Sequence, residues 1–124
     1  MKKILAILFL SFGIMASASL HANPEKSPQA AYIERFSALA VEEMYRSGVP
    51  ASITLAQGLL ESRYGLSELA IEANNHFGIK CHNWAGAKMF YDDDKKNECF
   101  RRYASAEESF RDHSDFLRFR DRYR

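Results

Sequence analysis

The sequence predicts an α+β fold that is mainly helical, with a small lobe of short antiparallel strands. Apolar residues recur at helical spacing over 28–47 and 50–62, and again from Ala106 onward. Between them, the segment 77–103 alternates short runs rich in aromatic residues with polar turns. These two patterns favour a helical body with one β-hairpin inserted before the last helix.

The first 22 residues are typical of a secretory signal peptide. Two lysines follow Met1, an apolar run extends from Ile4 to Ala18, and small residues come next. Cleavage could follow Ala18 or Ala22, and the loose polar segment after Ala22 favours the second site. The apolar run is short for a membrane span. We therefore expect an exported protein, periplasmic or associated with the cell wall, without stable membrane insertion.

Charge and length restrict the class of the mature protein, which we expect to be one domain over 23–124. Cleavage after Ala22 removes Lys2 and Lys3, which leaves 15 basic against 16 acidic residues. A nucleic-acid-binding protein would carry a basic face, so this class is excluded. The mature chain of 102 residues suits one small domain, which we expect to be a monomer.

Helix signals are clear at both ends of the first two helices. Ser27 and Pro28 form a capped start, and Gly48 provides a stop. The predicted inward stripe of this helix contains Ile33, Phe36, Ala40 and Met44. The second helix begins at Val49-Pro50 and ends near Ser62, with a predicted inward stripe of Ile53, Ala56 and Leu60 beside Leu55 and Leu59.

The second helix ends in a carboxylate with unusual surroundings. Glu61 follows Leu59 and Leu60 and lies at the negative pole of the helix dipole. Desolvation by these leucines and the dipole would both favour the protonated carboxyl, which is the form a general acid needs. Gln57 lies one turn earlier on the same edge. Gly58 costs about 1 kcal/mol relative to alanine, which indicates close approach of another element or a ligand.

The rest of the chain predicts a short helix, three strands and a final helix. Ser67 caps a helix through about Ala73, and Asn74-Asn75 ends it. Strands are predicted over 77–81, 88–91 and 99–103, with turns at 83–87 and 92–97. Ser105 to Glu108 is a capping box for the final helix, whose apolar side carries Phe110, His113, Phe116 and Leu117. This helix reaches Arg124 without a stop signal, so we expect the chain to be part of a longer protein.

Cys81 and Cys99 favour a disulfide in an exported protein, and its closed loop would contribute about 3 kcal/mol. The alternative is a zinc site made of His76, Cys81, His82 and Cys99. Its spacing fits no usual finger or ribbon pattern, so the disulfide is favoured and we expect neither a metal nor a cofactor.

Several motifs with fixed spacing resemble one family of enzymes. They are Ala56-Gln57 through Gly65, Asn75 with Phe77-Gly78-Ile79-Lys80, Trp84 with Gly86, Phe100-Arg101-Arg102-Tyr103, and Ser109 with Phe116-Leu117. Over roughly Ala30 to Leu117 the chain resembles glycoside hydrolase family 73, the glucosaminidases of bacterial autolysins and flagellar rod proteins. The resemblance implies a lysozyme-like helical lobe with a small β-lobe, and cleavage of the β-1,4 bond after N-acetylglucosamine in peptidoglycan. Family members continue with a further helical segment, so it also implies truncation at the C-terminus.

The resemblance also assigns residues. It implies that Glu61 is the general acid, and it draws a second carboxylate from the hairpin, where Asp94 is favoured ahead of Asp93; Asp92 and Glu98 lie nearby. A solvated acidic turn is the competing interpretation. Candidates for contacts with the sugar are Gln57, Tyr64, Asn75, Phe77, Trp84 and Tyr91. Two alternative functions are a lysozyme or lytic transglycosylase, and a non-catalytic wall-binding remnant of such a domain.

Overall fold

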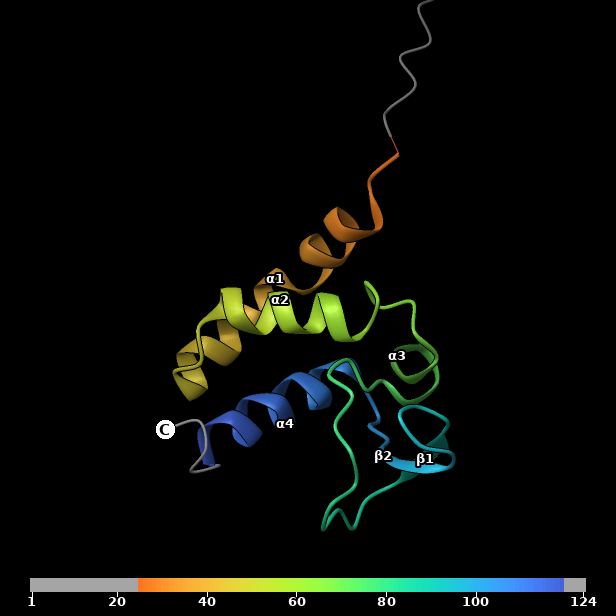
Figure 1. Cartoon of the computed structure of the whole chain (residues 1–124). Helices are drawn as coiled ribbons and strands as arrows, with labels where there is room; N and C mark the ends of the chain where they lie inside the picture. The colour runs from red at the N-terminus through yellow and green to blue at the C-terminus, as the bar shows by residue number, and fades with distance from the viewer. Residues whose placement is uncertain (1–24, 120–124) are drawn as a thin grey trace, which may run out of the picture.

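The computed structural model describes residues 25–119, which form four helices and one two-stranded antiparallel sheet (Figure 1). The predicted signal peptide lies outside these residues. The elements are α1 (Pro28–Ser47), α2 (Ala51–Glu61), α3 (Glu68–Ala73), β1 (Lys88–Tyr91), β2 (Glu98–Arg101) and α4 (Ala106–Phe119). The predicted mainly helical α+β class is confirmed. Within residues 25–119, no helix combines the length and apolarity needed to cross a membrane.

Helix α1 begins and ends where its local signals predict. The Ser27 hydroxyl accepts a hydrogen bond from the Ala30 amide at 3.2 Å. Gly48 takes a left-handed φ of +82° and its amide donates to the Met44 carbonyl at 2.9 Å. Tyr32 is buried, whereas Ile33 is 45% exposed. The buried face of α1 is therefore rotated from the predicted one.

The predicted inward face of α2 is wrong. Thr54 and Gly58 are fully or almost fully buried, as is Ser62 just beyond the helix, whereas Ile53 is 46% and Leu60 is 70% exposed. The reason is steric, since small residues at i, i+4 and i+8 allow close approach of neighbouring elements. A Cβ atom at position 58 would lie 2.6 Å from the hydroxyl of Tyr32, which confirms the close approach predicted there.

The sheet is a single hairpin whose register pairs Lys88 with Arg101 and Tyr91 with Glu98. The predicted strand over 77–81 is wrong, because within the described part of the chain this segment makes only an isolated bridge between Lys80 and Phe100. Gly78 adopts a φ of +60°, which breaks an extended path. In Figure 1 the segment between α3 and β1 runs as a long loop.

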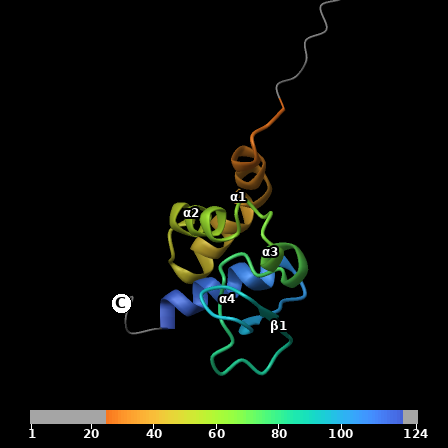
Figure 2. The same cartoon turned by 45° about the vertical axis from the view of Figure 1, so that its right-hand side comes forward.

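The core lies where α1, the loop after α3 and α4 meet. It contains Tyr32, Phe36, Ala40, Phe77, Ile79 and Phe110. Both views show α1 and α2 side by side, with α4 between this pair and the sheet (Figure 2). Helix α4 therefore contacts both earlier helices.

Polar contacts fix α4 at its start and along its length. The Ser105 hydroxyl accepts from the Glu108 amide at 3.4 Å, and the Glu108 carboxylate accepts from the amide of Ala104 at 3.0 Å. These two bonds form the predicted capping box, except that the Glu108 carboxylate accepts from the amide of Ala104 and not from that of Ser105. Further along, Nη1 of Arg101 in β2 donates to both carboxylate oxygens of Asp112, and the Tyr103 hydroxyl donates to one of them. Helix α4 and the sheet are thus held in one arrangement.

Candidate active site

A groove of about 310 Å³ opens between α2, α4 and the loop that follows α3. Three separate segments of residues 25–119 line it. Its residues are Gln57 and Glu61 from α2, Phe77, Gly78, Ile79, Lys80 and His82 from the loop, and His113, Phe116 and Leu117 from α4. The groove therefore combines a carboxylate with aromatic and amide side chains, which is the usual lining of a small-molecule site.

Glu61 is the last residue of α2 and lies in this groove. Its side chain is exposed, and Leu60 is 70% exposed, so the predicted desolvation by neighbouring leucines is wrong. The chain after Glu61 is held tightly. The hydroxyl of buried Ser62 donates to the Gly58 carbonyl at 2.5 Å and accepts from the Gly65 amide at 2.7 Å. Glu61 is thus an accessible carboxylate on a rigid helix end.

Gln57 lies one turn before Glu61 and meets a residue of α4. Its Oε1 atom lies 2.6 Å from Nε2 of His113. The His113 ring is stacked on Phe77, with ring centres 3.9 Å apart and planes at 14°. Burial lowers the pKa of His113 to about 4, so the ring is neutral near pH 7. The sequence indicates only an apolar side for α4, and no local signal marks this contact.

Asn75 supports the groove wall from behind. It is 1% exposed, and its Nδ2 atom donates to the carbonyls of Ile79 at 3.0 Å and Arg101 at 2.9 Å. Its Oδ1 atom accepts from the Ile79 amide at 3.1 Å. The structure therefore places Asn75 inside the wall, where it orders the loop, and outside the groove lining.

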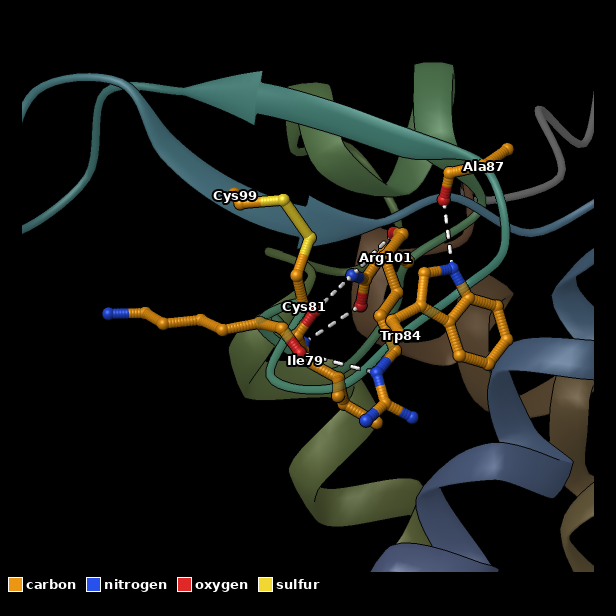
Figure 3. Close-up of a disulfide and its surroundings, with 8 residues drawn as sticks. Ile79, Cys81, Trp84, Ala87, Cys99 and Arg101 are labelled. Atoms are coloured by element: carbon orange, nitrogen blue, oxygen red, sulfur yellow. Dashed lines mark hydrogen bonds between the residues drawn. A yellow bond between two sulfur atoms is a disulfide. The ribbon is translucent and has the colours of Figure 1, made fainter.

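The predicted disulfide between Cys81 and Cys99 is confirmed, and it joins the groove loop to β2 (Figure 3). The amide of Cys81 also donates to the Cys99 carbonyl at 2.9 Å, and Arg101 donates from its amide to the carbonyl of Ile79 at 3.0 Å. Because the two sulfur atoms are bonded to each other, they are not available to zinc. The alternative zinc site is therefore excluded.

The remaining predicted aromatic residues lie outside the groove lining. Tyr64 packs against the core, and Tyr91 contacts Phe100 edge to face. Trp84 donates from its ring nitrogen to the Ala87 carbonyl at 2.9 Å, and the guanidinium of Arg101 lies 4.8 Å from its ring centre. Figure 3 shows this tryptophan beside Arg101 and hydrogen-bonded to Ala87. Of the six residues predicted to contact sugar, Gln57 and Phe77 line the groove.

The acidic hairpin carries the candidates for a second carboxylate. Asp93 and Asp94 are exposed and do not line the groove with Glu61. Lys80 connects the two regions, since its Nζ atom lies 2.8 Å from Glu98 and 3.9 Å from Asp94. The hydrogen bond from Lys80 lowers the pKa of Glu98, and the same bond raises the pKa of Lys80. Carboxylate oxygens of Asp93, Asp94 and Glu98 lie within 4.8 Å of one another, and the Lys80 ammonium already supplies a positive charge there.

Comparisons with known proteins bear on the family and the fold of the chain. The profile of the glucosaminidase family, described as mannosyl-glycoprotein endo-beta-N-acetylglucosaminidase, matches residues 37–124. The exo-glucosaminidase LytG of Bacillus subtilis (strain 168) is 36% identical over 101 residues, which cover 75% of this chain and 36% of LytG.

Solved structures of similar proteins have the same fold. The catalytic domain of the autolysin Auto from Listeria monocytogenes is 32% identical with a TM-score of 0.62, covering 75% of this chain and 58% of that one. The glycoside hydrolase domain of FlgJ from Salmonella typhimurium is 31% identical with a TM-score of 0.65, and the match covers 77% of this chain and 64% of the FlgJ chain. The peptidoglycan hydrolase of Sphingomonas sp. A1 is 30% identical with a TM-score of 0.67, and the match covers 75% of this chain and 64% of the Sphingomonas chain.

The chain thus spans about a third of the curated relative and about three fifths of these solved chains. The family profile covers well over half of the sequence and includes every segment that lines the groove. The fold of the described residues, a helical body with one hairpin, matches as well. On this evidence the chain belongs to the glucosaminidase family of glycoside hydrolases.

Proposed function

We propose that this chain is an exported peptidoglycan hydrolase, an endo-β-N-acetylglucosaminidase that cleaves the β-1,4 bond after N-acetylglucosamine. The observation that carries the proposal is Glu61, an accessible carboxylate on a fixed helix end in a groove lined by amide and aromatic side chains. Membership of the glucosaminidase family supports the reaction class. The names of the similar proteins, which include an exo-glucosaminidase and a peptidoglycan hydrolase, support the substrate class.

In this proposal Glu61 is the general acid. Its carboxyl group gives a proton to the glycosidic oxygen as the bond to the leaving sugar breaks, and a second carboxylate stabilises the sugar cation or activates water. We assign the second role to the hairpin, with Asp94 ahead of Asp93. Lys80 supports this choice because it contacts both the groove and Asp94. Glu98 is already engaged by Lys80 at 2.8 Å, so it is the less available carboxylate.

The groove lining supports a role for Gln57 and Phe77 in binding the sugar. Aromatic rings pack on the apolar faces of sugars, and an amide can hydrogen-bond an acetamido group. Tyr64, Trp84, Tyr91 and Asn75 lie outside the lining. We assign Tyr64 to packing of the core and the other three to support of the loop and the hairpin. Their substitution should affect stability more than substrate affinity.

The test is digestion of purified peptidoglycan followed by mass spectrometry of the soluble fragments. The wild-type chain should release reducing ends on N-acetylglucosamine, and Glu61→Gln should lower the rate by roughly 10²- to 10⁴-fold. Glu68→Gln removes an exposed carboxylate of α3 and should leave the rate unchanged. Equal rates for the wild type and Glu61→Gln would reject the proposal. Reducing or anhydro ends on muramic acid would instead support a lysozyme or lytic transglycosylase.

Export is tested separately on the chain with its first 22 residues present. A lysine pair, an apolar run and small residues at its N-terminus support a cleavable signal. N-terminal sequencing of the protein recovered outside the cytoplasm should begin at Asn23, or at Ser19 if cleavage follows Ala18. Recovery of the uncleaved chain only in the cytoplasm would contradict the proposal.

A further inference from the structure

His113 and Gln57 join α4 to α2 through one hydrogen bond in the groove lining. The bond length of 2.6 Å between Nε2 and Oε1 is short for neutral groups. Only Gln57 of this pair is exposed, since His113 is 5% exposed. An accessible amide is therefore tied to a buried ring.

The contacts of His113 decide which atom carries the proton. Nδ1 is buried and has no hydrogen-bond partner among residues 25–119. If the Gln57 carbonyl accepts, the proton lies on Nε2 and Nδ1 is an unpaired acceptor. The reverse arrangement would put the proton on Nδ1 and leave a buried N–H without an acceptor, which folded proteins rarely allow. Nε2–H therefore donates to Oε1 of Gln57, and the amide –NH₂ group of Gln57 is not used by His113.

The His113 ring cannot easily turn away from this position. It is stacked on Phe77, which is 8% exposed and packs edge to face on Phe110 at 4.9 Å. Neighbouring charges do not charge the ring, because burial outweighs the opposing effects of Asp112 and Glu43 on its pKa. Packing of the ring thus fixes the direction in which Nε2–H of His113 points toward Gln57.

The hydrogen bond from His113 orders a side chain that lines the groove beside Glu61. Gln57 and Glu61 are four residues apart on α2, so their side chains lie on one face, and both line the groove. A glutamine side chain on a helix surface normally samples several rotamers, and ordering it opposes binding. A partner that orders it beforehand lowers this barrier to binding.

We infer that His113 is a positioning residue, which holds the Gln57 amide so that its N–H groups donate to an oxygen of the bound N-acetylglucosamine unit. This inference rests on the proposed function. His113 does not touch the sugar itself and acts through Gln57. The ligand oxygen is an acceptor, either the acetamido carbonyl or a ring hydroxyl.

The experiment uses the full mature chain and N-acetylchitotetraose as the probe. His113→Phe keeps a ring against Phe77 and removes the donor, whereas His113→Gln can place an amide N–H near the position of Nε2. The dissociation constant, measured by calorimetry in a Glu61→Gln background to prevent turnover, should rise about tenfold for His113→Phe. For His113→Gln, the dissociation constant should return most of the way to the value of the Glu61→Gln parent. In the otherwise native chain, KM for soluble peptidoglycan fragments should rise similarly, with kcat changed less than threefold.

A double-mutant cycle separates positioning from a general structural effect. In a Gln57→Met background, His113→Phe should cause no further loss of affinity, because the amide is already absent. His76→Phe, which replaces another buried histidine that lies outside the groove, should leave the dissociation constant unchanged even where it lowers stability. Gln57 is exposed, so Gln57→Met should fold even if His113→Phe does not, and it should show the same tenfold loss.

Unchanged affinity in His113→Phe, or equal losses from this change in both backgrounds, would overturn the inference. Unchanged affinity in Gln57→Met would also overturn it. The proposed function fails on a different result, namely wild-type peptidoglycan digestion by Glu61→Gln, and the chitotetraose cycle can be read whichever way that test falls.

Discussion

Replacing Gly58 by alanine should destabilise the domain, although alanine is the better helix former. A Cβ atom at this position would lie 2.6 Å from the hydroxyl of Tyr32 and 3.2 Å from a ring carbon of Phe77. Tyr32 is 3% exposed, and its hydroxyl is 3.1 Å from Nδ1 of His76. The side chain therefore has little room in which to move aside.

The expected magnitude follows from three effects. Alanine gains about 1 kcal/mol of helix propensity. Overpacking of a well-filled core costs about 1–3 kcal/mol, and loss of the Tyr32–His76 hydrogen bond adds about 1 kcal/mol. The net loss of unfolding free energy is about 1–3 kcal/mol. For a domain of this size it corresponds to a fall in Tm of roughly 5–20 °C.

Thermal and urea unfolding, followed by circular dichroism, measure this loss. The matched control is the same change in a Tyr32→Phe background, which removes the hydroxyl from the clash. There Gly58→Ala should be neutral or stabilising by up to about 1 kcal/mol, since only the contact to Phe77 remains and it needs a small shift. A stabilised Gly58→Ala single variant, or an undiminished loss in the Tyr32→Phe background, would refute the steric reasoning.

Three other predictions concern stability. Replacing both cysteines by serine should lower the unfolding free energy by about 3 kcal/mol in urea titrations, because the bond closes a separation of 18 residues; two free thiols in oxidised protein would contradict this. Burial lowers the pKa of His76 and His113 to about 4, so between pH 4 and 6.5 the unfolded chain binds more protons than the folded one. The unfolding free energy should therefore rise from pH 4 to pH 7, and it should fall again by up to about 3 kcal/mol per histidine as the pH is lowered. Urea midpoints that do not change over this pH range would show that burial does not lower the pKa of the two rings. Asp112→Asn should cost about 2 kcal/mol in the same assay, since it removes a partly buried carboxylate shared by an arginine and a tyrosine. Asp115→Asn, which breaks a more exposed pair, should cost less than about 1 kcal/mol.

Local signals in the sequence were sufficient for helix ends and for the hairpin. Ser27 caps α1 with its own hydroxyl and Gly48 ends the helix in a left-handed conformation, so both depend on neighbouring residues alone. The strand 88–91 and its partner were predicted within two residues of their observed ends. The disulfide was predictable because two cysteines have few other uses in a chain that is expected to be exported.

Features that depend on distant residues were not predictable. Hydropathy favoured Ile53 and Leu60 as the buried face of α2, but steric fit selected Thr54, Gly58 and Ser62. The segment 77–81 has a strand-like composition.

In the structure, however, the side chain of Asn75 accepts a hydrogen bond from the Ile79 amide and donates one to the Ile79 carbonyl, and Gly78 takes a positive φ that breaks an extended path. The contact of Gln57 with His113 joins residues 56 positions apart, and neither residue type signals it locally. Glu61 was singled out on its motif, whereas the desolvation used to support it was wrong.

The division of the groove among α2, the loop after α3 and α4 has a consequence for measurement. A ligand that touches all three segments can bind only while they are packed together, so its binding is coupled to unfolding of the whole domain. At a concentration one hundred times its dissociation constant, such a ligand would raise the unfolding free energy by about 2.7 kcal/mol. A thermal-shift titration with glycan fragments therefore reports affinity without turnover, and can rank variants that lack all catalytic activity.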